Sequence, residues 1–133
     1  MRTIRWALVL LLAPLGYVAA VLLAILLTQL LVRLCPQHLL VSGLCTASWY
    51  TTAEVAAFAF ATAVGAALWV VLPSLVAPAH RSRVAWVAFV LGAAYATWFM
   101  SQVGMGFAVP FGSALVSGAV AAVHVWSRYR HAA

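Results

Sequence analysis

Residues 6–32 read WALVLLLAPLGYVAAVLLAILLTQLLV, an apolar run whose only polar side chains are Thr28 and Gln29. A helix needs about 20 apolar residues to cross a bilayer, because the hydrocarbon core spans roughly 30 Å and each helical residue rises about 1.5 Å. This stretch is long enough to cross with residues to spare. It therefore predicts a membrane-spanning helix near the start of the chain.

Three further segments are apolar, uncharged and long enough to span a membrane: residues 55–75, 84–103 and 107–126. None alternates between apolar and polar residues with a period of two, as the strands of a membrane β-barrel do. We therefore expect an all-α integral membrane protein, a bundle of four transmembrane helices in one domain over residues 1–133.

The composition supports the same class. Of the 133 residues, 68% are hydrophobic and 6% are charged, against about 25% charged in a typical soluble domain. The formal net charge is +6, but the seven arginines are scattered between apolar segments and form no basic face. These numbers exclude a soluble enzyme, a disordered chain and a nucleic-acid-binding domain.

The arginines predict the orientation, because positively charged residues in short connections stay on the cytoplasmic side. With four spans, both termini and the connection between the second and third helices share one side. That side carries Arg2, Arg5, Arg81, Arg83, Arg128 and Arg130. The opposite side carries only Arg33, in the loop that joins the first two helices. We expect both termini to be cytoplasmic, in a bacterial inner membrane, with this loop outside.

Small residues at four-residue spacing mark the faces through which membrane helices pack closely. The candidates are Ala57, Ala61, Gly65, Gly92, Ala114 and Gly118. The first helix is bulky and rich in leucine. We therefore expect the last three helices to pack together, with the first facing lipid or a partner. The small-residue faces serve either this internal packing or the docking of another subunit.

Cys35 and Cys45 both lie in the predicted outer loop. Disulfides persist in the oxidising compartment outside the cytoplasm, so we favour a disulfide over free thiols. Redox catalysis is a further alternative. It is not favoured, because the chain lacks the Cys-x-x-Cys spacing that lowers a thiol pKa.

Glu54 is the only acidic residue and follows Thr51 by three positions. Thr-x-x-Glu is the capping-box pattern, in which both side chains bind free backbone N–H groups at the start of a helix. The alternative is a functional carboxylate, because ionisable groups at membrane depth often mark binding or proton pathways. Arg33 is then its expected partner.

Several polar side chains are expected at the same outer level, where they could line a shallow substrate pocket. These residues are Glu54, Arg33, Gln29, Ser101 and Gln102. The alternative is that helix ends near lipid headgroups are simply more polar. No aspartate, no second carboxylate, no phosphate-binding glycine loop and no metal-ligand spacing of histidines occurs. The sequence thus predicts a protein that is not an enzyme and needs no cofactor or metal.

With four short spans in 133 residues, the chain resembles small multidrug exporters and small polyprenyl-linked sugar flippases in size and span count alone. In the exporters a glutamate lies within the first span, whereas Glu54 lies at the mouth of the second. Our first hypothesis is a non-catalytic subunit or accessory protein that packs against membrane lipids, a membrane-protein partner or further copies of itself, with no nucleic-acid partner. The second is a small oligomeric transporter or lipid-linked substrate flippase. The third is a thiol redox membrane protein.

Overall fold

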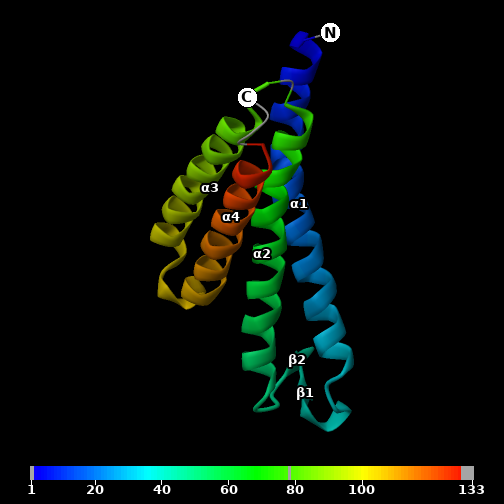
Figure 1. Ribbon diagram of the computed structural model, residues 1–133. Coiled ribbons are helices and arrows are strands. Elements are labelled where there is room, and N and C mark those ends of the chain that lie inside the picture. The colour runs from blue at the N-terminus through cyan, green and yellow to red at the C-terminus, as the bar shows by residue number, and fades with distance from the viewer. Residues whose placement is uncertain (1, 78, 130–133) are drawn as a thin grey trace.

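The computed structural model describes residues 2–77 and 79–129, without the side chains of residues 2, 3 and 5 (Figure 1). Arg130 and the side chains of Arg2 and Arg5, used above for orientation, lie outside the described part. Within that part the long helices are α1 (Arg2–Arg33), α2 (Tyr50–Val76), α3 (Arg81–Val103) and α4 (Ala108–Tyr129). All four are long and apolar enough to cross a membrane. The predicted helical bundle is confirmed, and it fits an integral membrane protein.

The helices extend beyond the predicted apolar windows. α2 begins at Tyr50, five residues before the predicted start, and contains Pro73 near its end. A short 3-10 helix, η2 (Met105–Phe107), precedes α4. The additional residues lie at helix ends. Polar side chains interrupt the apolar run there, so a prediction from hydropathy ends the helix too early.

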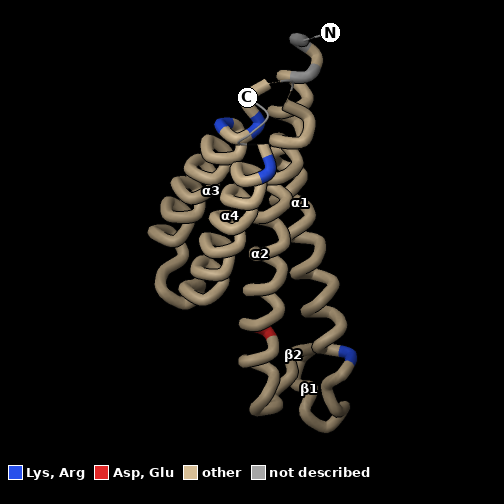
Figure 2. The backbone as a smooth tube through the Cα atoms, viewed as in Figure 1, with Lys and Arg blue, Asp and Glu red and all other residues tan. Residues whose placement is uncertain are grey.

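α2 is the central helix. It packs against α1, against α4 and, less extensively, against α3, which also packs against α4. Both described chain ends and the α2–α3 connection lie at one end of the bundle, which we call the arginine end because Arg81, Arg83 and Arg128 gather there (Figure 2). The α1–α2 connection lies at the opposite end, which we call the disulfide end.

The two helical hairpins differ in length. α1 and α2 have 32 and 27 residues, whereas α3 and α4 have 23 and 22. At about 1.5 Å per residue, α1 and α2 measure about 48 and 40 Å, and α3 and α4 about 34 and 33 Å. The rings of Phe107 and Phe58 meet edge to face at 6.1 Å, so the α3–α4 turn reaches α2 at Phe58. Beyond this level α1 and α2 continue without α3 and α4 (Figure 1).

α2, α3 and α4 pack against one another as expected, but α1, which was expected to face lipid or a partner, also packs on α2. The most extensive helix contact in the described part of the chain joins α1 to α2. A Cβ atom at Gly16 would lie 2.6 Å from the Trp69 backbone nitrogen, and one at Gly65 would overlap the Ala20 methyl group. The two backbones thus approach closely because both positions are glycine.

The disulfide end is a small folded cap. It consists of η1 (Gln37–Leu39) and an antiparallel pair of strands, β1 (Leu40–Val41) and β2 (Leu44–Cys45). The hairpin turns at Ser42 and Gly43, whose φ angles of 52° and 83° are positive, as a two-residue type I′ turn requires.

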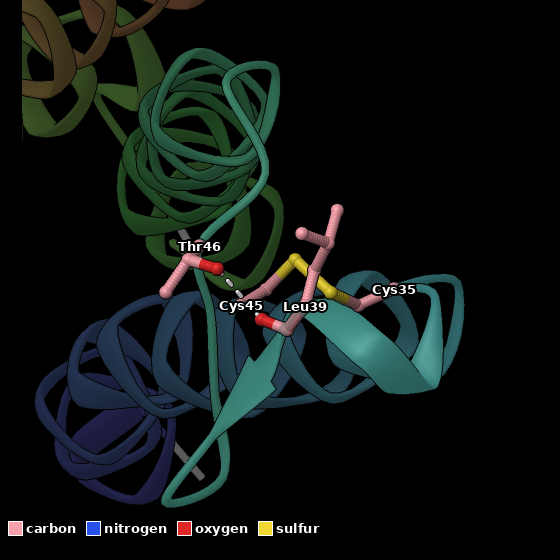
Figure 3. Close-up of a disulfide and its surroundings, with 4 residues drawn as sticks. All are labelled: Cys35, Leu39, Cys45 and Thr46. Atoms are coloured by element: carbon pink, nitrogen blue, oxygen red, sulfur yellow. Dashed lines mark hydrogen bonds between the residues drawn. A yellow bond between two sulfur atoms is a disulfide. The ribbon is translucent and has the colours of Figure 1, made fainter.

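The Cys35–Cys45 disulfide is confirmed, with Cα atoms 6.0 Å apart (Figure 3). The hydroxyl of Thr46 donates a hydrogen bond to the Leu39 carbonyl at 2.9 Å. Both cysteines are buried and pack with Ala47 and Tyr50 in a separate small core. The cap therefore fixes the end of α1 to the start of α2.

Candidate functional site

A cavity of about 430 Å³ lies on the side of the bundle where α1 and α3 face each other. Its walls are α1 between Gly16 and Thr28 and α3 between Phe89 and Phe99, and its floor is formed by α2 and α4. α1 and α3 barely touch, so the cavity opens sideways between them. We call it the α1–α3 groove.

The lining of the groove is almost wholly apolar. Its width comes from small residues, chiefly Gly92, Ala93 and Ala96 on α3. Two threonines also line it, but both hydroxyls are already hydrogen-bonded. Thr28 donates to the Ala24 carbonyl at 2.9 Å, and the Thr62 hydroxyl lies 2.9 Å from the Phe58 carbonyl and 3.0 Å from the Pro110 carbonyl of α4. The groove thus offers apolar surface rather than hydrogen-bonding groups.

Trp69 closes the groove toward the arginine end. Its indole N–H donates to the Ala88 carbonyl at 3.0 Å and so ties α2 to α3. A Cβ atom at position 92 would lie 3.2 Å from the indole nitrogen, so Gly92 leaves room for this ring. The buried residues Val70, Ala85, Ala122 and Val125 form the core beyond it.

Two tyrosines bridge the opening. The rings of Tyr17 and Tyr95 meet edge to face at 6.4 Å, and both line the groove. They are 53% and 48% exposed. Among the described residues, neither phenolic hydroxyl forms a hydrogen bond.

A smaller hollow of about 330 Å³ lies on α1 toward the disulfide end. It is lined by Thr28, Gln29, Val32 and Arg33. Thr28 lines both spaces. All four lining residues belong to α1, so this hollow is a depression on the surface of that helix and not a continuation of the groove.

The capping box expected around Glu54 is absent. α2 begins at Tyr50 after Trp49, with no side-chain cap, so Thr51 and Glu54 both lie within the helix. The pattern identified the right region but placed the helix start too late. Glu54 is half-buried, and among the side chains that the structure describes it forms no ion pair with Arg33.

The predicted polar set is only partly brought together. Gln29 and Arg33 share the hollow, but Glu54, Ser101 and Gln102 do not line it. Ser101 is exposed near the end of α3 and donates its hydroxyl to the Trp98 carbonyl at 2.6 Å. Gln102 beside it is exposed as well.

The predicted packing residues lie inside the bundle. Ala61, Gly65 and Gly118 are buried, and Ala57 is half-buried. Gly92 and Ala114 line the groove. The sequence argument did not identify Thr62 and Trp69, whose polar atoms join helices, although a hydroxyl or an indole within a predicted span is a signal of interhelical hydrogen bonding.

Comparisons with protein-family models, curated proteins and solved structures found no match to this chain. The candidate site is therefore defined by geometry. Its parts are the α1–α3 groove, the hollow with Gln29 and Arg33, and Glu54.

Proposed function

We propose that this protein is a small, non-catalytic membrane subunit or accessory protein whose α1–α3 groove binds an apolar guest. The guest is a lipid chain or a transmembrane helix of a partner. The observation that carries the proposal is the groove itself, which is apolar, opens sideways and has a volume within the range of about 300–1,000 Å³ typical of ligand pockets.

The proposed setting is a bacterial inner membrane crossed by all four helices. The disulfide end would face the outside, where a disulfide persists. The arginine end would face the cytoplasm, in agreement with the positive-inside rule. In this setting the groove opens toward the hydrocarbon of the bilayer.

The chemistry of the groove supports an apolar guest. Membrane helices gain little from the hydrophobic effect and associate through close packing beside small residues. The groove offers such residues on α1 and α3, including Ala24 and Ala96. Leu26 and Leu91 are largely exposed on the same two helices, as expected for side chains that face lipid or a partner.

The test is to fill the groove. Ala96 lines it, whereas Ala94 on the same helix does not. We expect Ala96→Trp to lose the lipid or protein that co-purifies in mild detergent, while Ala94→Trp keeps it, as read by native mass spectrometry. Equal bound mass in wild type and in a folded Ala96→Trp variant would overturn the proposal.

The second candidate is a small transporter or flippase. The hollow with Gln29 and Arg33 favours it, because a cation beside an amide suits the anionic group of a substrate. Under this alternative Glu54 and Gln102 also contribute to substrate binding. Transport into proteoliposomes that persists unchanged in Glu54→Gln would remove the role of that carboxylate.

A further inference from the structure

The α1–α3 groove has nearly the same length on all four helices that line it. Its lining runs over residues 16–28 of α1, 58–70 of α2, 89–99 of α3 and 107–118 of α4. At about 1.5 Å per residue, these ranges measure about 18, 18, 15 and 17 Å. The groove is therefore about 17 Å long and runs along the helices.

The groove is closed toward the arginine end. Trp69 forms its end wall and is held there by the hydrogen bond from its indole N–H to the Ala88 carbonyl. A Cβ atom at Gly16 would lie 2.6 Å from the Trp69 nitrogen, so the adjacent Tyr17 lies at the same level. The edge-to-face contact of Tyr17 with Tyr95 covers the sideways opening there. A guest that reaches Trp69 thus extends no further.

The groove is accessible from the disulfide end. At that end it reaches the level of Phe58 and Phe107, where the turn between α3 and α4 meets α2. α1 and α2 continue past this level, whereas the α3–α4 hairpin ends there (Figure 1). A long, thin guest can therefore enter from the disulfide end and lie along the groove with its tip at Trp69.

The cross-section of the groove selects a thin guest. A volume of about 430 Å³ over a length of about 17 Å corresponds to a mean cross-section of about 25 Å². A helix with its side chains is about 10–12 Å wide and needs roughly 80–110 Å². A hydrocarbon chain, whose carbons contact their neighbours at about 4 Å, needs on the order of 20 Å². The groove therefore fits one such chain and not a whole helix.

We infer that the groove binds a single unbranched acyl chain of a lipid whose headgroup lies at the disulfide end, and that Trp69 sets the longest chain that fits. This inference rests on the proposed function, since it names the guest. The hydroxyls of Thr28 and Thr62 are already hydrogen-bonded, so an acyl chain leaves neither of them unpaired. An extended chain advances roughly 1.2 Å per bond, so about 14 carbons span the groove.

The test moves the end wall. Ala93 lines the groove about 9 Å from the level of Phe99, so Ala93→Phe should leave room for only about 8 carbons. Ala94 is exposed and does not line the groove, so Ala94→Phe is the matched control. Trp69→Phe removes part of the end wall and should admit longer chains.

The probe is an equimolar mixture of lysophosphatidylcholines, which share one headgroup and carry single saturated chains of roughly 8 to 18 carbons, a range that brackets the length of the groove. Native mass spectrometry of the full chain in detergent identifies the bound lipids. We expect them to peak near about 14 carbons in the wild type and in Ala94→Phe, and near about 8 carbons in Ala93→Phe. In a folded Trp69→Phe variant the peak should move to longer chains than in the wild type.

The outcomes separate the inference from the proposed function. Binding that rises steadily to the longest chain in the wild type, or the same distribution in Ala93→Phe and Ala94→Phe, overturns the acyl-chain inference. If Ala96→Trp displaces a partner protein and the bound lipids are unchanged, the groove remains a binding site but the acyl-chain inference is wrong. If Ala96→Trp displaces nothing, the proposed function fails as well.

Discussion

α2 contacts its two main neighbours in different ways. Toward α1, Gly65 meets Gly16 and Ala20 with the backbones in close approach. Toward α4, hydroxyl groups carry the contact: Ser113 donates to the Ala59 carbonyl at 2.8 Å and Ser117 to the Ala63 carbonyl at 2.7 Å. One face of α2 thus depends on shape and the other on hydrogen bonds.

This difference predicts which amino-acid substitutions each helix contact can tolerate. Close backbone packing fails when any atom is added, since side-chain rearrangement cannot relieve a clash with a backbone. A hydrogen bond between membrane helices contributes only about 0.6 kcal/mol on average, so its loss is tolerated. The α1 contact should therefore be the more fragile of the two under substitution.

The largest effect is expected for Gly65→Leu. The new side chain must displace Ala20 of α1, so we expect a loss of about 3 kcal/mol or more in the free energy of unfolding. Unfolding in a denaturing detergent titration measures it. Gly112→Leu is the matched control, because no atom lies within 4 Å of a Cβ atom at Gly112. Equal losses in the two variants would contradict the close α1–α2 contact.

A smaller effect is expected when the covalent link between α1 and α2 is removed. The disulfide spans a sequence separation of 10 residues, and loop-closure entropy predicts a loss of about 2–3 kcal/mol for Cys45→Ser. The same titration, with and without reductant, checks this value. Reductant should destabilise the wild type and leave the variant unchanged.

If Cys35→Ser or Cys45→Ser abolished a cellular function without loss of fold, the thiol redox hypothesis would gain support.

The smallest effect is expected on the α4 side. Ser117→Ala removes one interhelical hydrogen bond and should cost about 0.6 kcal/mol. Ser127→Ala is the control, because its hydroxyl donates to His124 of its own helix. A loss for Ser117→Ala as large as that for Gly65→Leu would reverse the comparison.

The sequence predicted the four helices because span length and hydropathy are local properties. It also predicted the disulfide, from two cysteines in one short connection. It did not predict that α1 packs closely on α2. Gly16 and Ala20 supply the small-residue face of α1, but the surrounding leucines made that helix look uniformly bulky.

The groove could not be predicted, because it depends on the angle and register between helices. Tyr17 and Tyr95 lie 78 positions apart, and nothing local indicates that their rings meet. The expected polar pocket assumed that all helices end at one level. α3 ends at Val103, and the turn after it reaches only Phe58 of α2, one turn before Glu54.

The unequal apolar runs have a consequence for the surrounding bilayer. The apolar run of α1, residues 6–32, measures about 40 Å, whereas those of the other three helices, residues 55–75, 84–103 and 107–126, measure about 30 Å each. In a membrane that matches the three shorter runs, α1 must tilt, or the lipids beside it must stretch, at a fraction of a kcal/mol per Å of mismatch. The deformation falls on one flank only, so lipids there would differ in order from those beside α3.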